Sequence, residues 1–315
     1  MFFSKDFIET AEGLIFAVVA QGTEQGKALC FLRYVKVDSG WKKVTTESAN
    51  AFLKQYYPDY LHYSPVMDAH LHAVAINRIV KHHQPKQRLQ QIMQKNQHDV
   101  IEGDLFQLCN LLQQYGLDIT QMGITGSILV GVQNENSDID LVCYGREVFH
   151  QCRAITRELI EQDNLQELNE NDWRQSYQRR SCDLSFADYI WHERRKTNKA
   201  IINGRKFDLS CSHATCEDND SMHSGMVNYQ KCGVITLQCK IIDDTHAFDY
   251  PAEFKIDHEA FDAIVCFTAT YTGQAIKGET VEVSGIIEQT QLGDKRIVVG
   301  SSREANGEYI RVIRA

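Results

Sequence analysis

Two aspartates, Asp138 and Asp140, begin an apolar stretch and constrain the surrounding fold more than any other feature of the sequence. In an extended strand, residues i and i+2 face the same side of the sheet, so the two carboxylates lie side by side while Ile139 and Leu141 face the core. Adjacent negative charges are unfavourable unless a cation lies between them or one carboxylate takes up a proton. Because Mg²⁺ prefers oxygen ligands, the pair predicts a divalent-metal site on a strand over residues 139–144.

Gly126 and Ser127 form the second informative element, upstream of the aspartates. The pattern predicts a strand over residues 122–125, followed by a turn and a helix that begins at Gly126. Glycine lets the backbone approach a phosphate closely, and the start of a helix offers unpaired N–H groups. The Ser127 hydroxyl adds a donor. The segment therefore predicts a cradle for the β- and γ-phosphates of a nucleoside triphosphate.

Gly126-Ser127 followed by the run SDIDLV at residues 137–142 resembles the signature of the polymerase-β-type nucleotidyltransferase superfamily. Gly131 also stands where minimal members often carry a glycine. The resemblance covers about residues 105–215. The flanking parts are similar to an uncharacterised group of predicted nucleotidyltransferases, common in archaea, that carry extra N- and C-terminal domains.

The resemblance implies a third carboxylate on a later strand, acting as a metal ligand and as the base for the incoming hydroxyl. Asp208 is the first candidate, because it lies in a strand after a predicted hairpin turn, with Phe207 and Leu209 on the opposite face. Asp183, in the stretch RRSCDLSFAD, also lies in a short alternation of apolar and polar residues and is the alternative.

The activity implied by the resemblance is transfer of a nucleoside monophosphate from a triphosphate to an acceptor hydroxyl or phosphate, with release of pyrophosphate. Gly126 and Ser127 would bind the nucleotide, and Asp138, Asp140 and Asp208 would hold Mg²⁺ or Mn²⁺. RNA, a protein or a small molecule could serve as the acceptor. Two alternatives stay open: a catalytically degenerate nucleotide-binding regulatory module, and a nucleic-acid-binding scaffold that uses the C-terminal β domain.

The hydrophobic patterns along the chain predict an α+β protein with a short mixed sheet and helices at its centre. We expect an α+β N-terminal domain over residues 1–95, a nucleotidyltransferase domain over 96–232 and a small β-barrel-like domain over 233–315. Gly285 predicts a bulge in one of the last strands. The other expected elements are a hairpin within 14–37, helices over 46–57, 71–81, 100–115 and 146–162, and a hairpin over 199–212 turning at Asn203-Gly204.

The 315 residues contain 33 Lys and Arg against 42 Asp and Glu, a formal charge of −9. This acidic balance argues against a protein that coats long nucleic acids. The sequence has no apolar run long enough to span a membrane, and Lys5, Asp6 and Glu9 interrupt the stretch where a signal peptide would be apolar. We therefore expect a cytoplasmic protein whose ten cysteines are reduced.

The densest basic stretch precedes Asp208 and predicts either ordinary solvated side chains or contacts to phosphate near the metal site. Its members are Arg194, Arg195, Lys196, Lys199 and Arg205. A zinc site at Cys211, His213 and Cys216 is disfavoured, because a zinc knuckle has two regularly spaced cysteine pairs.

Overall fold

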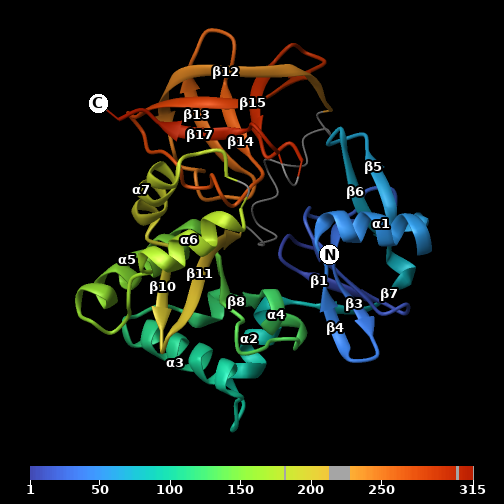
Figure 1. Cartoon of the computed structure of the whole chain (residues 1–315), viewed down its shortest axis with the longest axis vertical. Helices are drawn as coiled ribbons and strands as arrows, with labels where there is room; N and C mark the ends of the chain where they lie inside the picture. The colour runs from blue at the N-terminus through green and yellow to red at the C-terminus, as the bar shows by residue number, and fades with distance from the viewer. Residues whose placement is uncertain (181, 213–227, 303–304, 315) are drawn as a thin grey trace. The chain divides into compact units, whose positions relative to one another are not determined.

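The computed structural model describes residues 1–180, 182–212, 228–302 and 305–314 (Figure 1). It confirms a mixed α+β protein, whose described residues form three sheets. The chain packs as two compact units, and the three-domain division expected from the sequence stays a prediction. None of the helices in the described ranges combines the length and hydropathy needed to cross a membrane. The first unit comprises the described parts of Met1–Ser64, His70–Leu165 and Ile201–Cys216, and the second those of Pro65–Ala69, Gln166–Ala200 and Glu217–Ala315.

The first sheet has the order β5-β6-β3-β2-β1-β7, with β4 paired to β3. One face packs against α1 (Thr46–Tyr56) through Leu53, and the other packs Tyr34 against Leu129 of the following region. The helix α1 is the one predicted over residues 46–57, and Thr45 caps it. The strands are β1 (Phe7–Thr10), β2 (Leu14–Val18), β3 (Lys27–Val37), β4 (Gly40–Lys43), β5 (Leu61–Ser64), β6 (Ala69–Ala75) and β7 (Ile79–His83), with short 3₁₀ turns at Pro58–Tyr60 and Ile76–Arg78.

The helix predicted over residues 71–81 is wrong, because this stretch forms β6, a 3₁₀ turn and β7. Strand β6 pairs with β3, and the Leu32 amide donates to His72 Nδ1 (2.9 Å) across the two strands. A short apolar run fits a helix or a buried strand equally well by its spacing. The pairing with β3, which is distant in sequence, decides between them.

The central sheet has the order β10-β11-β9-β8, in which β11 runs parallel to β9 and β8 runs antiparallel to it. Helix α5 packs on β9 and β11, and α2 packs on β8 (Figure 1). The strands predicted over 122–125 and 139–144, the helices over 100–115 and 146–162, and the hairpin over 199–212 are confirmed. The elements are α2 (Pro85–Met93), α3 (Val100–Gln114), a 3₁₀ turn (Ile119–Gln121), β8 (Met122–Thr125), α4 (Gly126–Val130), β9 (Ile139–Tyr144), α5 (Arg146–Glu161), β10 (Lys199–Ile202) and β11 (Arg205–Ser212).

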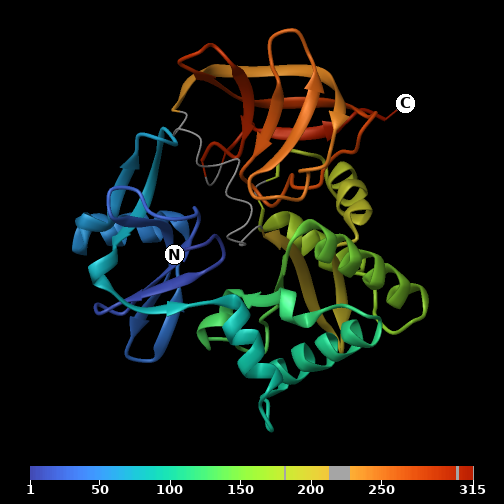
Figure 2. The same cartoon turned by 180° about the vertical axis from the view of Figure 1, so that it is seen from behind.

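The third sheet has the order β12-β13-β14-β16-β15-β17, and an added β12–β15 pairing makes it ring-like (Figure 2). Its core includes Leu184, which precedes α7 in the chain, so the second unit joins two stretches that are separate in sequence. The helices α6 and α7 were not predicted. The elements are α6 (Glu170–Gln178), α7 (Phe186–Lys196), β12 (Tyr229–Asp243), β13 (Ala252–Asp257), β14 (Ala263–Cys266), β15 (Thr280–Thr290), β16 (Lys295–Val299) and β17 (Tyr309–Val312).

The bulge expected at Gly285 is also wrong, because the register of β15 with β12 is regular there and shifts instead between Lys231 and Gly233. A Cβ on Gly285 would lie 2.4 Å from the Val298 carbonyl oxygen. Glycine is therefore needed at this position for the close approach of two backbones.

Candidate functional site

Gly126 and Asp140 lie in contact where β8 gives way to α4. Gly126 has φ 69°, and a Cβ built on it would lie 2.3 Å from Asp140 Oδ2. A larger residue would collide with the carboxylate in addition to adopting a left-handed backbone conformation. The glycine of the predicted phosphate cradle therefore also makes room for a predicted metal ligand.

Asp140 and Asp208 are partners in the parallel register of β9 and β11. Residues in register on neighbouring strands share one face of the sheet. The residues that alternate with them, including Ile139 and Phe207, are fully buried on the other face. The fold therefore brings together the two carboxylates that were predicted from separate segments of the sequence.

Asp138 lies immediately before β9 and is half-buried. Burial, together with the negative charges of Asp208 and Asp138, raises the pKa of Asp140 to about 6. The positive charges of Lys5 and Lys43 partly offset this rise, because they lower the pKa of the same carboxyl. The charges of both other aspartates therefore act on the Asp140 carboxyl.

The donor set of this site suits a hard divalent cation, because it consists of carboxylate oxygens that repel one another. Within the described ranges, however, no group of three or more His, Cys, Asp or Glu side chains is arranged to hold a metal ion as it stands. The carboxylates offer the charge and the oxygen ligands that a divalent cation prefers, and a metal site here stays a prediction.

Ser127 lies half-buried in the first turn of α4, a helix of only 5 residues. So short a helix sums few peptide dipoles, so its contribution to anion binding is smaller than the sequence suggested. Thr125 makes no side-chain cap to the helix, because its hydroxyl donates to the Lys5 carbonyl oxygen (3.0 Å) instead. The first amides of α4 thus lack a side-chain cap, which suits contact with a phosphate.

Lys5 and Lys43 influence the pKa of Asp140, and the sequence reasoning connected neither lysine with that residue. Both come from the N-terminal sheet region, Lys5 just before β1 and Lys43 at the end of β4. Burial lowers the pKa of Lys5, while Asp140 and Asp208 oppose that shift. No motif or spacing in the sequence connects these lysines to the aspartates, because their proximity depends on packing between distant segments.

Asp183, the alternative third carboxylate, is exposed, and its Oδ2 accepts a hydrogen bond from the Gly307 amide (2.8 Å). The negative charge of Asp208, by contrast, raises the pKa of Asp140. Asp208 is in register with Asp140, and its role as the third carboxylate stays a prediction.

Most members of the basic stretch before Asp208 form ion pairs with carboxylates. Lys196 Nζ donates to Glu193 Oε1 (2.5 Å), and Lys199 bonds to the other oxygen of the same buried carboxylate. Arg205 Nε donates to Asp104 Oδ2 (2.8 Å). These three cations are paired with carboxylates, whereas Arg194 of the same stretch is exposed.

The disfavoured zinc site at Cys211, His213 and Cys216 stays untested, because only Cys211 is among the described residues. Cys211 is buried in the strand, as expected for a small apolar residue. His213 and Cys216 lie outside the described residues.

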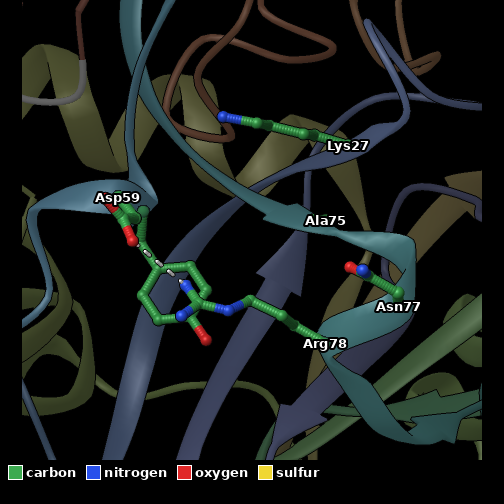
Figure 3. Close-up of a pocket in the computed structure, with 6 residues that line it drawn as sticks. Lys27, Asp59, Ala75, Asn77 and Arg78 are labelled. Atoms are coloured by element: carbon green, nitrogen blue, oxygen red, sulfur yellow. Dashed lines mark ion pairs between the residues drawn. The ribbon is translucent and has the colours of Figure 1, made fainter.

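A separate hollow of about 260 Å³ lies in the N-terminal sheet region (Figure 3). Arg78, which lines it, forms ion pairs with Asp59 (3.6 Å) and Glu12 (4.0 Å). The guanidinium also lies over the Tyr60 ring, 5.0 Å from its centroid. None of the predicted site residues lines this hollow, and its arginine already has carboxylate partners.

Comparison with known proteins gives two matches. Residues 107–206 match the family described as a nucleotidyltransferase domain, a range that contains Gly126, Ser127, Asp138 and Asp140 but ends before Asp208. The chain is also 32% identical over 347 aligned residues to the uncharacterized protein MJ1086 of Methanocaldococcus jannaschii, with 98% of each chain covered. No solved structure matches the chain.

Proposed function

Because the chain belongs to the polymerase-β-type nucleotidyltransferase superfamily, with its nucleotidyltransferase domain at residues 107–206, we propose that it is a metal-dependent nucleotidyltransferase. It would move a nucleoside monophosphate from a nucleoside triphosphate to an acceptor hydroxyl or phosphate and release pyrophosphate. The observation that carries the proposal is the register of Asp208 with Asp140, directly beside the Gly126 turn.

The roles follow from the chemistry of each side chain. The amides at the start of α4 and the Ser127 hydroxyl bind phosphate oxygens of the triphosphate. Asp208 takes the proton of the acceptor hydroxyl as its oxygen bonds to the α-phosphorus and the bond to pyrophosphate breaks. Mg²⁺ or Mn²⁺ held by Asp138, Asp140 and Asp208 would polarise the attacking oxygen and stabilise the leaving pyrophosphate.

The test uses each of the four nucleoside triphosphates with a radioactive label on either the α-phosphate or the γ-phosphate. The protein is incubated with Mg²⁺ or Mn²⁺ and with RNA, a protein extract or a small-molecule fraction. Transfer of a nucleoside monophosphate moves the α-label to an acceptor and leaves the γ-label in pyrophosphate. Asp208→Asn is the matched control, because it keeps the shape of the side chain. Equal α-labelling by the wild type and this variant would contradict the assigned role of Asp208.

A catalytically degenerate nucleotide-binding module is the second candidate. It is favoured by the observation that, in the described part of the chain, no three-ligand group is ready to hold a metal. This candidate predicts that a non-hydrolysable triphosphate binds in calorimetry, while no acceptor fraction takes up the α-label with either metal.

A further inference from the structure

Lys5 is held against the end of β8, next to the predicted phosphate turn. Its carbonyl oxygen accepts from Thr125 Oγ1 (3.0 Å), and its amide donates to the Val18 carbonyl oxygen (3.3 Å). The Val18 amide in turn donates to the Asp6 carbonyl oxygen (2.8 Å). These bonds fix the main chain of Lys5 beside the residue that precedes Gly126.

Lys5 also adopts a left-handed backbone conformation, with φ 81°. Glycine adopts this conformation freely, whereas for any other L residue, such as lysine, the conformation is unfavourable. A turn selected only for its shape would favour glycine or asparagine. A backbone outlier beside a candidate site is a reason to seek a function for its side chain.

The side chain of Lys5 belongs to the electrostatic environment of the carboxylates. The negative charges of Asp140 and Asp208 favour its charged form, and its positive charge in turn favours the ionised form of Asp140. The packing of Tyr34 and Phe7 against Leu129 of α4 fixes the N-terminal sheet beside this site. The position of Lys5 is therefore set by a buried apolar contact as well as by hydrogen bonds.

We propose that the Lys5 ammonium group, which comes from the N-terminal sheet region, is a permanent positive charge of the nucleotidyltransferase site. Before metal binds, its ammonium group offsets the charges of Asp140 and Asp208. When metal takes these carboxylates, the ammonium group binds the phosphates of the triphosphate. This inference rests on the proposed function, and it extends the phosphate site beyond residues 107–206.

The proposal predicts opposite effects on two ligands. A fixed positive charge repels a divalent cation, so its removal should strengthen the binding of metal alone. The same charge attracts phosphate, so its removal should weaken the binding of a metal–triphosphate complex. A lysine with only a structural role would not produce changes of opposite sign.

The experiment uses the full chain, with Mn²⁺ alone and with Mn²⁺–tripolyphosphate as probes, because tripolyphosphate carries the phosphate chain without a base. In Lys5→Met we expect the Kd for Mn²⁺ to fall about ten-fold and the Kd for tripolyphosphate to rise about ten-fold, each corresponding to about 1.4 kcal/mol. Lys5→Asn should change both Kd values in the same directions, and it serves as a second variant because asparagine tolerates the left-handed backbone. Lys42→Met, an exposed change on β4, is the control and should alter neither value.

The outcomes separate this inference from the proposed function. Failure of the wild-type protein to bind either probe would overturn both. Binding of both probes by the wild type, with no change in either Lys5 variant, would overturn the role of Lys5 alone. Weaker binding of both probes in Lys5→Met and Lys5→Asn, with lower thermal stability, would make Lys5 a structural residue and would also overturn the inference.

Discussion

Arg205 Nη1 donates a hydrogen bond to the main-chain carbonyl oxygen of Ser137 (2.7 Å), and so ties the start of β11 to the residue before Asp138. The same guanidinium is paired with Asp104 of α3 through Nε (2.8 Å). One partly buried arginine thus connects the strand that carries Asp208 with the segment that carries Asp138.

Replacing Arg205 with Met should destabilise the protein and weaken metal binding. The side chains of Arg205 and Asp104 are only 12% and 11% exposed, and loss of one partner of a buried pair costs about 3 kcal/mol. Urea denaturation and Mn²⁺ titration measure the two effects. Arg174→Met, which breaks an exposed pair with Glu170, is the control and should cost less than about 1 kcal/mol. Unchanged Mn²⁺ affinity in Arg205→Met would show that the arginine does not position Asp138.

Gly126→Ala should abolish binding of both metal and nucleotide, because the new Cβ would displace the Asp140 carboxylate. Gly131→Ala is a close control, since Gly131 has φ 73° but open space where a Cβ would stand. Each substitution should cost about 1 kcal/mol of folding free energy for the left-handed backbone. Calorimetry with Mn²⁺ and tripolyphosphate should show a loss only in Gly126→Ala. Equal losses in both variants would mean that backbone strain, and not the contact with Asp140, is responsible.

The metal-free protein should lose stability as the pH rises from about 4 to about 6. The pKa of Asp140, about 6 in the folded protein, lies above the value of about 3.9 for an unfolded aspartate. The folded state therefore binds more protons in this window, and the free energy of unfolding falls with increasing pH. Since each pKa unit corresponds to about 1.4 kcal/mol, the whole shift is worth about 3 kcal/mol, of which about 2 kcal/mol is lost between pH 4 and pH 6.

The measurement for this prediction is the melting temperature as a function of pH with a chelator present. Asp140→Asn should flatten the profile and be more stable than the wild type at pH 7 but not at pH 4. Added Mn²⁺ should stabilise only the wild type at pH 7. A variant with the same slope as the wild type would place the titrating group elsewhere.

Asp208→Asn should lower the rate of nucleotidyl transfer by at least about 100-fold, the usual contribution of a positioned general base. Tripolyphosphate binding should fall much less, because Ser127 and the amides of α4 are unchanged. Asp183→Asn should leave the rate within about two-fold, because Asp183 is exposed and bonded to the Gly307 amide. Single-turnover kinetics with an α-labelled triphosphate distinguish the two. Loss of transfer in Asp183→Asn alone would move the role of base to that residue.

Features governed by neighbouring residues could be predicted from the sequence. The strand before Gly126, the alternation around Asp140 and the turn at Asn203-Gly204 each depend on a few adjacent side chains and on backbone preferences. The same alternation in β11 placed Asp208 on a polar face before any pairing was known. The positions of the candidate phosphate and metal residues in their own elements therefore follow from local pattern.

Features governed by contacts between distant segments could not be predicted. Residues 71–81 form strands because β3 supplies the hydrogen bonds, and Gly285 is required because the Val298 backbone approaches it. The main chain of Lys5 lies beside the Gly126 turn because Tyr34 packs on Leu129 and Thr125 donates to the Lys5 carbonyl oxygen. The sequence by itself determined where the candidate residues lie within their own strands and turn, since strand alternation and glycine turns are local. Only the tertiary structure decided which cations stand beside them, because burial and pairing act between residues that no spacing in the chain connects.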